Sequence, residues 1–551
     1  MSVVLRSFLR NLSRPACVDA QSTFTYAQIL SEAVKLRAFL GPLSSSSQAR
    51  IAYLVPRDGR YIVSKTAAWL AGGIGVPLAE NHPPEELRYT LEDSGATYLL
   101  TTPERKAELQ PIADALKIKL IEVFPLSSGA EPMSTVSLTE AIHLAIGDEK
   151  TENAAAAELI NSTASSPLTP SPGAFLIYTS GTTGRPKGVL TTHSTLAAQI
   201  HAMATAWRWS EQDRIYSVLP LHHVHGIVAI VLTALASGAC VELAPRFDAA
   251  ASWRAFSRPP ASTPEQALLF PGTIQPTLFM AVPTVYVKML EAHKKAEIET
   301  QTKWIEAVRS PQSQIRLMVS GSAALPESVA TSWKSLTGHT LLERYGMTEF
   351  AMAISNPYEG ERRVNTVGKP LPGYKARLVP EREGSDPRDG GELQITGPGV
   401  FTEYWGKPEA TKETFTVSDH WFKTGDRAIM DADGYYSIQG RLSADILKMG
   451  GYKISALDIE RVLLDSPLVA EIAVLGLPDD TWGEKVAAIV VLREAVKTED
   501  EKALLDSLRE FGAANLAPYK LPTVVKVLPE MPRNAMGKVN KKQLRKDIFG
   551  V

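Results

Sequence analysis

The segment from Tyr178 to Gly188 gathers groups that bind phosphate. It has the sequence Tyr-Thr-Ser-Gly-Thr-Thr-Gly-Arg-Pro-Lys-Gly and follows a short apolar run, Ala174 to Tyr178, that predicts a buried strand. Its glycines allow backbone N–H groups to turn inward as an anion-binding nest, and its hydroxyls and Lys187 add donors and a charge suited to phosphate. The spacing differs from that of a Walker A loop. We therefore predict a nucleotide-phosphate loop of another kind, against the alternative of a polar surface turn.

Two later motifs combine a strand with small residues or a turn. Arg316 to Pro326 predicts a strand that runs into Ser-Gly-Ser-Ala-Ala, where a flat ligand could lie against the backbone; a tight strand-to-helix connection is the alternative. Glu343 to Glu349 has the sequence Glu-Arg-Tyr-Gly-Met-Thr-Glu. Its tyrosine offers a ring that can stack on a base, its glycine permits a close turn, and its threonine and final glutamate offer oxygen ligands for Mg²⁺.

Three further motifs supply an acid, a cation and a second lysine. Lys423-Thr-Gly-Asp426 places a carboxylate after a turn, where it can contact both ribose hydroxyls. Gly440-Arg441 offers a cation for a phosphate, and Pro532 to Lys538 places a lysine on a glycine turn. Each motif alone has the alternative of ordinary surface chemistry. Their joint occurrence in this order and with these gaps is not expected by chance.

Three histidines occur in Pro220-Leu-His-His-Val-His-Gly226, before an apolar run that ends at Val241. A metal cluster is one interpretation, but no acid or cysteine lies nearby in sequence, and the adjacent His222 and His223 cannot share one strand face. Structural histidines are a second interpretation, and the wall of a substrate pocket is the one we favour. The apolar run has about 16 residues, fewer than the ~20 that a bilayer span requires, so we expect a buried helix and no membrane span.

Length and composition limit the classes of protein. The chain has 551 residues, which exceeds one hydrophobic core and predicts at least two domains. A hydrophobic content of 44% and a charged content of 21% are ordinary for a soluble protein. The formal net charge of −2 argues against a broad nucleic-acid surface. Cys17 and Cys240 lie far apart in sequence, so we expect neither a disulfide framework nor a zinc site.

The pattern of elements changes near Gly440. Before it, residues 24–40 and 61–72 have apolar positions at helical spacing and 74–78 has the pattern of a strand, which predicts α/β layering. After it, the sequence predicts a small α+β unit, with the domain boundary near Arg441. The predicted elements of that unit are a helix to Leu464 opened by the capping box Ser455-Ala-Leu-Asp458, strands at 469–477 and 486–492, and a helix at 497–515.

The N-terminus has two interpretations. Its arginines between residues 6 and 14, with no acid before Asp19, resemble a weak transit peptide. Its apolar residues between 5 and 9 could equally belong to the first helix of the fold. We favour no targeting signal and predict a cytoplasmic protein, with a mitochondrial protein as the alternative.

Together these motifs resemble the adenylate-forming superfamily of acyl-CoA synthetases, luciferases and peptide-synthetase adenylation domains, over essentially the whole chain. The resemblance implies a multidomain α/β and α+β fold. A large N-terminal domain of stacked β-sheets and helices would span 1–440, and a small mobile α+β C-terminal domain 441–551. It also implies two steps: a carboxylate attacks the α-phosphate of ATP to give acyl-AMP and pyrophosphate, and coenzyme A then displaces AMP.

The resemblance also implies a role for each motif residue. The catalytic residues would be Glu349, Arg441 and Lys538. Of these, Lys538 would bridge the attacking carboxylate and the α-phosphate. The ATP site would comprise Thr179, Ser180, Gly181, Thr182, Thr183, Gly184, Arg185, Pro186, Lys187, Gly321, Ser322, Ala323, Tyr345, Gly346, Met347, Thr348, Asp426 and Arg441. Thr182 and Glu349 would hold Mg²⁺, the coenzyme A side would comprise Gly450, Gly451 and Lys453, and Ser443 would form the hinge, where relatives usually carry Asp or Lys.

Arg344 indicates the acid substrate. The run that begins there looks like the malonyl-CoA synthetase branch in particular, since many relatives carry a neutral residue at this position. A buried guanidinium is costly unless it is paired, and a second substrate carboxylate would pair it through a bidentate fork. The alternative is that Glu343 or another protein acid already neutralises Arg344. The other predicted substrate-binding residues are His223, Ser322 and Met347.

The predicted function is therefore an ATP-dependent malonate–CoA ligase that forms malonyl-CoA through malonyl-AMP, with methylmalonate as a second substrate. The nearest alternatives are a short- or medium-chain monocarboxylate–CoA ligase and a stand-alone adenylation domain that loads a carrier protein. A luciferase-like monooxygenase and a catalytically inactive ATP-binding protein are more distant ones. The expected partners are malonate, ATP, Mg²⁺ and coenzyme A, with no nucleic acid and no membrane span, in a monomer or weak homodimer.

Overall fold

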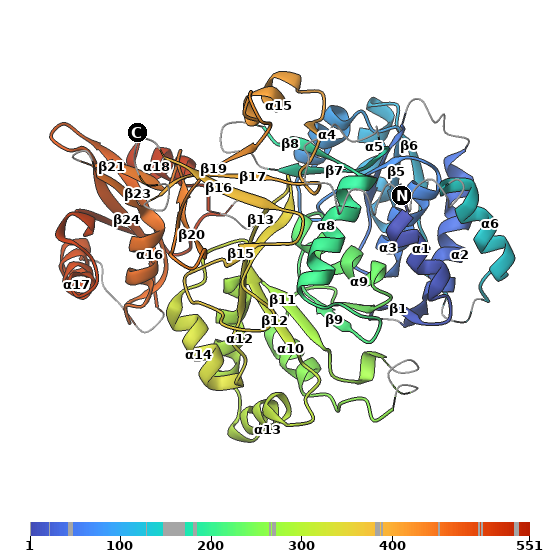
Figure 1. Cartoon of the computed structure of the whole chain (residues 1–551), viewed down its shortest axis with the longest axis horizontal. Coiled ribbons are helices and arrows are strands. Elements are labelled where there is room, and N and C mark those ends of the chain that lie inside the picture. Colours follow the sequence, from blue (N-terminus) through green and yellow to red (C-terminus); the bar gives the residue numbers. More distant parts are fainter. Residues whose placement is uncertain are drawn as a thin grey trace.

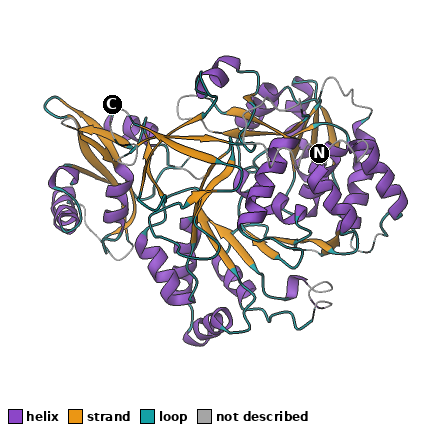
Figure 2. Ribbon diagram, in the orientation of Figure 1, coloured by secondary structure: helices purple, strands orange, loops and turns teal. Residues whose placement is uncertain are grey.

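A computed structural model gives the fold of the chain (Figures 1 and 2). It has a large N-terminal domain and a small C-terminal domain, and it confirms the predicted mixture of α/β and α+β layers. The structure describes residues 2–20, 22–41, 48–127, 129, 131–146, 171–179, 185–263, 266, 271–380, 386, 390–449, 452–493, 496, 500–533 and 539–551.

Two large sheets form the N-terminal domain, and most of their inner strands pair in parallel. Parallel strands are covered on both faces, which explains their nearly continuous apolar sequences. The nine-stranded sheet has the order β15 (Lys369–Pro370), β14 (Ala351–Ser355), β13 (Leu342–Met347), β12 (Leu317–Gly321), β11 (Leu278–Ala281), β9 (Arg214–Ser217), β10 (Cys240–Leu243), β1 (Pro15–Val18) and β2 (Thr23–Thr25). The seven-stranded sheet has the order β18 (Glu403–Tyr404), β8 (Lys187–Thr192), β7 (Gly173–Thr179), β4 (Ile74–Pro77), β3 (Arg50–Leu54), β5 (Tyr98–Thr101) and β6 (Lys119–Glu122).

Helices join these two sheets into one core. Phe175 of the seven-stranded sheet and Phe279 of the nine-stranded sheet belong to the same buried cluster. The helices that contribute to this core or cover it are α1 (Ser2–Arg10), α2 (Tyr26–Arg37), α3 (Gly59–Leu70), α6 (Thr135–Ile146), α8 (His193–Ala206), α9 (Thr233–Ala236), α10 (Ala249–Phe256), α12 (Pro283–Lys295), α13 (Ile298–Arg309) and α14 (Glu327–Thr337). A second cluster lies under α4 (Pro84–Ser94) and α5 (Pro103–Ala115).

A third, antiparallel sheet leads to the C-terminal domain. Its strands are β16 (Lys375–Val379), β17 (Gly391–Thr396), β19 (Phe422–Met430) and β20 (Tyr436–Arg441), with α15 (Pro408–Thr414) before β19. The C-terminal elements are β21 (Ile446–Met449), β22 (Tyr452–Ser455), α16 (Ala456–Leu464), β23 (Val469–Asp479), β24 (Gly483–Leu492), α17 (Glu501–Ala513), β25 (Val524–Val527) and α18 (Lys541–Phe549). Their buried clusters draw only on residues after 446, so this domain has its own core. The boundary at 440/441 stays a prediction.

Several element predictions are confirmed with small shifts in their ends. The predicted capping hydroxyl is present, because Ser455 Oγ accepts a hydrogen bond from the Asp458 N–H at 3.1 Å. Residues 5 and 8 are buried on α1, so the N-terminal apolar residues form the first helix of the fold. The apolar run after Gly226 is a buried π-helix, His225–Leu232, followed by α9. The helix predicted for this run was expected to reach Val241, and that prediction is wrong from Cys240, where β10 begins. None of the described helices is long and apolar enough to cross a membrane.

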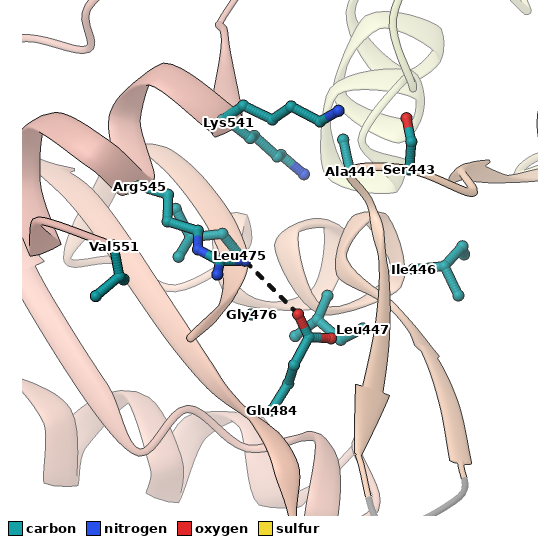
Figure 3. Close-up of a pocket in the computed structure, with 11 residues that line it drawn as sticks. Ser443, Ala444, Ile446, Leu447, Leu475, Gly476, Glu484, Lys541, Arg545 and Val551 are labelled. Atoms are coloured by element: carbon teal, nitrogen blue, oxygen red, sulfur yellow. Dashed lines mark ion pairs between the residues drawn. The ribbon is translucent and has the colours of Figure 1, made fainter. Parts of the chain in front are cut away.

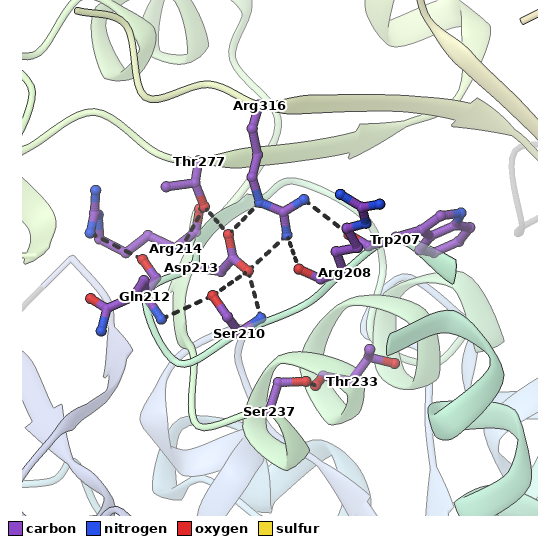
Figure 4. A network of polar contacts seen from close by, with 10 residues as sticks. All are labelled: Trp207, Arg208, Ser210, Gln212, Asp213, Arg214, Thr233, Ser237, Thr277 and Arg316. Atoms are coloured by element: carbon purple, nitrogen blue, oxygen red, sulfur yellow. Dashed lines mark hydrogen bonds and ion pairs between the residues drawn. The ribbon is translucent and has the colours of Figure 1, made fainter. Parts of the chain in front are cut away.

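Arg316 fixes the start of β12 through a buried network (Figure 4). Its Nε and Nη2 donate to the two carboxylate oxygens of Asp213 at 2.8 and 2.7 Å. Asp213 also accepts from Thr277 Oγ1 at 2.8 Å and from the Ser210 N–H at 2.8 Å. The network therefore ties together the starts of three strands of the nine-stranded sheet, β9, β11 and β12.

Lys65 of α3 is fully buried, and none of the described residues forms an ion pair with it. Within the described part of the chain, its Nζ has no hydrogen-bond partner and lies 4.2 Å from the centroid of the Trp69 ring and 5.9 Å from that of Phe8. The aromatic faces offset only part of the desolvation cost of the ammonium group. Burial accordingly lowers the pKa of Lys65 to about 7.

We expect Lys65→Met to raise the unfolding free energy of the N-terminal domain by roughly 1–4 kcal/mol near neutral pH. The lysine of the unfolded chain stays protonated up to a pH of ~10.4, whereas the buried lysine is neutral above its lowered pKa. Its cost is therefore largest below pH ~7 and falls as the pH rises toward ~10.4. Urea unfolding at both ends of this window measures the gain, with Lys334→Met on the exposed face of α14 as the control. Equal gains at the two pH values would contradict this explanation.

Candidate functional site

The strands on either side of the predicted phosphate loop form a hairpin. Thr179 of β7 pairs with Lys187 of β8, and Tyr178 pairs with Gly188. Arg185 and Pro186 lie just before β8. The hairpin brings the two ends of the loop together, as a turn that surrounds an anion requires. Five predicted loop residues lie outside the described residues: Ser180, Gly181, Thr182, Thr183 and Gly184.

Tyr404 connects Lys187 to Glu349. Lys187 Nζ lies 4.8 Å from the centroid of the Tyr404 ring, and the Tyr404 hydroxyl donates to Glu349 Oε1 at 2.7 Å. Glu349 is buried, and this burial raises the pKa of its carboxyl group although the Tyr404 hydrogen bond opposes the rise. The geometry places the loop lysine and a desolvated acid around one tyrosine. Sequence reasoning missed Tyr404, because it belongs to no motif and joins β8 only through the two-residue strand β18.

Asp426 joins Tyr345 to Arg441. The Tyr345 hydroxyl donates to Asp426 Oδ2 at 2.5 Å, and Arg441 Nε lies 2.7 Å from Asp426 Oδ1. Asp426 and Arg441 are direct neighbours in the register of β19 and β20. Burial alone would lower the pKa of Arg441, but the Asp426 carboxylate raises it overall. Three predicted ATP-site residues thus share one hydrogen-bonded group.

Arg344 is held against the backbone turn that ends β12. Gly321 is its direct neighbour across β12 and β13, and a Cβ atom at Gly321 would lie 2.6 Å from the guanidinium carbon. Only glycine leaves room for the guanidinium there. Arg344 Nη2 donates to Ser322 Oγ at 3.3 Å, and Ser322 Oγ lies 3.3 Å from His225 Nδ1. Ser322 adopts φ +69°, a conformation that is uncommon for residues other than glycine and that aims its hydroxyl at both groups.

The charge on Arg344 is not compensated by the described protein groups. Its side chain is 3% exposed, its Nε has no hydrogen-bond partner within the described chain, and no described acid forms an ion pair with it. Burial lowers the pKa of Arg344 to about 9. His225 lies next to this group, and burial, then the charge of Arg344, lowers the pKa of its imidazole, which favours the neutral form. In the described chain, His225 Nε2 also has no hydrogen-bond partner.

Glu343 does not neutralise Arg344, so that part of the alternative is wrong. Successive side chains of a strand point to opposite faces, and these two residues are neighbours on β13. Burial raises the pKa of Glu343 to about 8, and the opposing charge comes from Arg461 rather than Arg344. Sequence alone could not decide between two adjacent residues until the sheet assigned each to a face.

The structure places some of the other predicted site residues near the groups described above. Met347 Sδ lies 3.9 Å from Arg441 Nη2, and a Cβ atom at Gly346 would lie 1.9 Å from the Ala351 carbonyl oxygen, which confirms the close turn. His223 lies beside His222, with ring centroids 4.2 Å apart, whereas His225 is the histidine that contacts Ser322. Thr348 follows β13, Ala323 follows the β12 turn, Ser443 follows β20 and Lys453 lies on β22. Gly450, Gly451 and Lys538 lie outside the described residues.

Comparison with known proteins gives concordant results. Residues 6–405 match the family described as AMP-binding enzyme, and residues 458–538 match the AMP-binding enzyme C-terminal domain. The mitochondrial malonate–CoA ligase of Xenopus laevis is 40% identical over 563 residues, which cover 96% of this chain and 89% of that protein. The crystal structure of ATP-bound MatB from Rhodopseudomonas palustris is 29% identical, with a TM-score of 0.78 and full coverage of both chains. A malonyl-CoA ligase solved with methylmalonyl-CoA and AMP is 34% identical, with a TM-score of 0.61, and the match covers 95% of this chain and 97% of that one.

The family match spans both sheets of the large domain, and the second match falls within the domain that has its own core. The match over residues 6–405 includes the β7–β8 hairpin, the β12 turn and the β13 motif on which the site is built. The chain belongs to the family of AMP-binding enzymes.

Proposed function

We propose that this protein is an ATP-dependent malonate–CoA ligase that forms malonyl-CoA through malonyl-AMP and releases AMP and pyrophosphate. The uncompensated guanidinium of Arg344 carries the proposal. A second carboxylate on the substrate would supply the missing charge and accept hydrogen bonds from the guanidinium and from Ser322 or His225. A fatty acid would leave the guanidinium unpaired. Relatives named for malonate and a structure holding methylmalonyl-CoA agree with malonate and methylmalonate as the acids.

The residues of the site suit the two steps. In the first, the carboxylate of malonate that does not contact Arg344 attacks the α-phosphorus of ATP, and the bond from that phosphorus to pyrophosphate breaks. Lys538 would lie between the two anions and stabilise the charge that develops there, while Lys187 and its loop hold the pyrophosphate. Asp426 and Arg441 would contact the ribose. In the second step the sulfur of coenzyme A attacks the acyl carbon, its proton is lost, and AMP leaves.

A magnesium ion fits beside Glu349. No described basic group forms an ion pair with this buried carboxylate, and burial raises the pKa of its carboxyl group, so a cation would relieve its desolvation. Carboxylate and hydroxyl oxygens are the protein ligands that Mg²⁺ accepts. Glu349 and Thr182 would hold the ion, which would neutralise phosphate charge when bound.

The remaining assignments concern the C-terminal domain and the state of the protein in the cell. We place the hinge at Ser443 and the coenzyme A side at Gly450, Gly451 and Lys453. We also propose a monomer or weak homodimer. The compartment is proposed as cytoplasmic, with the mitochondrion as the alternative that the name of the Xenopus laevis relative favours.

A substrate panel tests the proposed function. Release of AMP in the presence of ATP, Mg²⁺ and coenzyme A is measured with malonate, methylmalonate, succinate, acetate and hexanoate. We expect malonate to give the highest kcat/KM and the monocarboxylates the lowest, because only a dicarboxylate pairs Arg344. Higher activity with acetate or hexanoate would instead support the monocarboxylate ligase. AMP release that does not depend on coenzyme A would support an adenylation domain acting on a carrier protein.

A further inference from the structure

Lys541, at the start of α18, is a largely buried cation between two carboxylates. Its Nζ lies 2.5 Å from Asp445 Oδ1 and 2.7 Å from Glu460 Oε1. The three side chains are only 12%, 13% and 16% exposed, respectively. Burial raises the pKa of Glu460, and the two carboxylates raise the pKa of Lys541 against the effect of its own burial. The group is therefore a paired charge cluster, in contrast to the lone cation at Arg344.

Asp445 extends this cluster to the predicted hinge. Its Oδ2 accepts a hydrogen bond from the Arg441 N–H at 2.9 Å, and its own N–H donates to the Arg441 carbonyl oxygen at 2.8 Å. These two bonds close a turn across residues 441–445, which includes Ser443. A change of φ and ψ at Ser443 would separate Asp445 from Arg441 and break both bonds. Lys541 and Ser443 line the same cleft of about 310 Å³ (Figure 3).

Lys541, which is also paired with Glu460, holds the Asp445 carboxylate from the side of the C-terminal domain. Glu460 Oε1 also accepts from the Val474 N–H of β23 at 2.6 Å, which anchors the cluster to that core. On the other side of the turn, the Arg441 side chain pairs with Asp426 of the predicted ribose site. One polar chain thus runs from Asp426 through Arg441 and Asp445 to Lys541, across the junction of the two domains.

We propose that Lys541 is a positioning residue that, through Asp445, latches the hinge turn in the conformation that forms the adenylate. The chain has a TM-score of 0.78 against the ATP-bound relative and of 0.61 against the relative that holds AMP and a thioester product, and on this ground we assign the latched state to the first step. Without Lys541, the buried Asp445 and Glu460 carboxylates would repel each other, and the turn would lose its fixed geometry. The contacts of Lys541 Nζ are with Asp445 and Glu460, so in this proposal its effect is exerted through the hinge.

The test separates the two half-reactions of the full-length enzyme, since the inference rests on the proposed acyl-adenylate chemistry. Adenylate formation is measured by ATP–pyrophosphate exchange with malonate, and thioester formation by conversion of supplied malonyl-AMP with coenzyme A. For Lys541→Met we expect a loss of about 10²-fold in exchange, the scale of a misplacement of about 1 Å, and a thioester rate within a few-fold of the parent rate. Lys541→Arg should restore exchange because it keeps the charge. Lys546→Met, on the exposed face of α18, is the control.

Equal loss of both half-reactions, or no loss of exchange, would overturn the latch. Asp445→Asn keeps an acceptor for the Arg441 N–H but removes the charge, so it should also lose more pyrophosphate exchange than thioester formation, by a smaller factor. This variant replaces Lys541→Met if that protein does not fold. An Asp445→Asn enzyme with unchanged balance would also overturn the inference. The wild-type substrate panel tests the proposed function independently. If another acid proves to be the substrate, the ratio of half-reactions is measured with that acid and its adenylate.

Discussion

Arg344→Ala should lower kcat/KM for malonate by roughly 30-fold to several thousand-fold, which corresponds to a loss of about 2–5 kcal/mol of transition-state stabilisation. The loss reflects a substrate carboxylate left in a buried pocket without its guanidinium partner. Activity with butyrate should change little or rise, because that acid never pairs Arg344. The measurement is kcat/KM for both acids, with Arg254→Ala on the exposed face of α10 as the control. Equal losses with malonate and butyrate would rule out the dicarboxylate assignment.

The same substitution should separate function from stability. In the described chain the Arg344 guanidinium forms no ion pair, so the free protein bears its desolvation cost without compensation. Removing it should leave the thermal unfolding midpoint unchanged or higher, while malonate activity falls. Arg344→Lys keeps a charge but loses the planar fork, so it should recover only part of the activity. A large drop in stability would indicate instead that Arg344 has a structural partner.

The motifs in the sequence predicted the contents of the site better than its contacts. Gly321 was expected to let a flat ligand approach the backbone, whereas in the structure the guanidinium of Arg344 already uses that space. The two residues are 23 positions apart, and only the parallel pairing of β12 with β13 makes them neighbours. Strand register is a tertiary property, so a motif can show that a glycine is needed without showing for which group.

Two of the contacts that sequence reasoning missed are non-local. Tyr404 reaches Glu349, and Lys541 reaches Asp445, across 55 and 96 positions. None of these pairings follows from local spacing, since each depends on how separate elements pack. His225 was one of three histidines in the motif, of which His223 was the predicted substrate-binding residue, and only the path of the π-helix decides which imidazole contacts Ser322.

The elements themselves were more predictable, because their patterns are local. Alternating helices and strands indicated the large domain, and the Ser455 cap and the strands after it indicated the small one. The error at Cys240 arose because a continuous apolar run does not show where a buried helix ends and a buried parallel strand begins. In such a run both elements are apolar on all sides, and only tertiary packing separates them.

Lys538→Ala should abolish most adenylate formation, with a loss of about 10²–10³-fold, the cost of removing one donor that stabilises developing charge. Malonate and the α-phosphate of ATP are both anions and must approach within bonding distance, so a cation between them acts mainly in the transition state. The loss should therefore appear in kcat, with the KM values for ATP and malonate changed much less. ATP–pyrophosphate exchange measures this step, and Lys546→Ala is the matched control on α18.

Conversion of supplied malonyl-AMP to malonyl-CoA by Lys538→Ala should stay close to the parent rate. In that step a thiol attacks an acyl carbon that is already activated, and no second anion has to approach the α-phosphate. A lysine that acts only between malonate and ATP has no charge left to neutralise there. Equal loss of both half-reactions would mean that Lys538 also serves thioester formation, or that the small domain does not change position between the steps. Because Lys541→Met is expected to give the same direction of imbalance through the hinge, Lys538→Ala with Lys541→Met should be less than additive in adenylate formation.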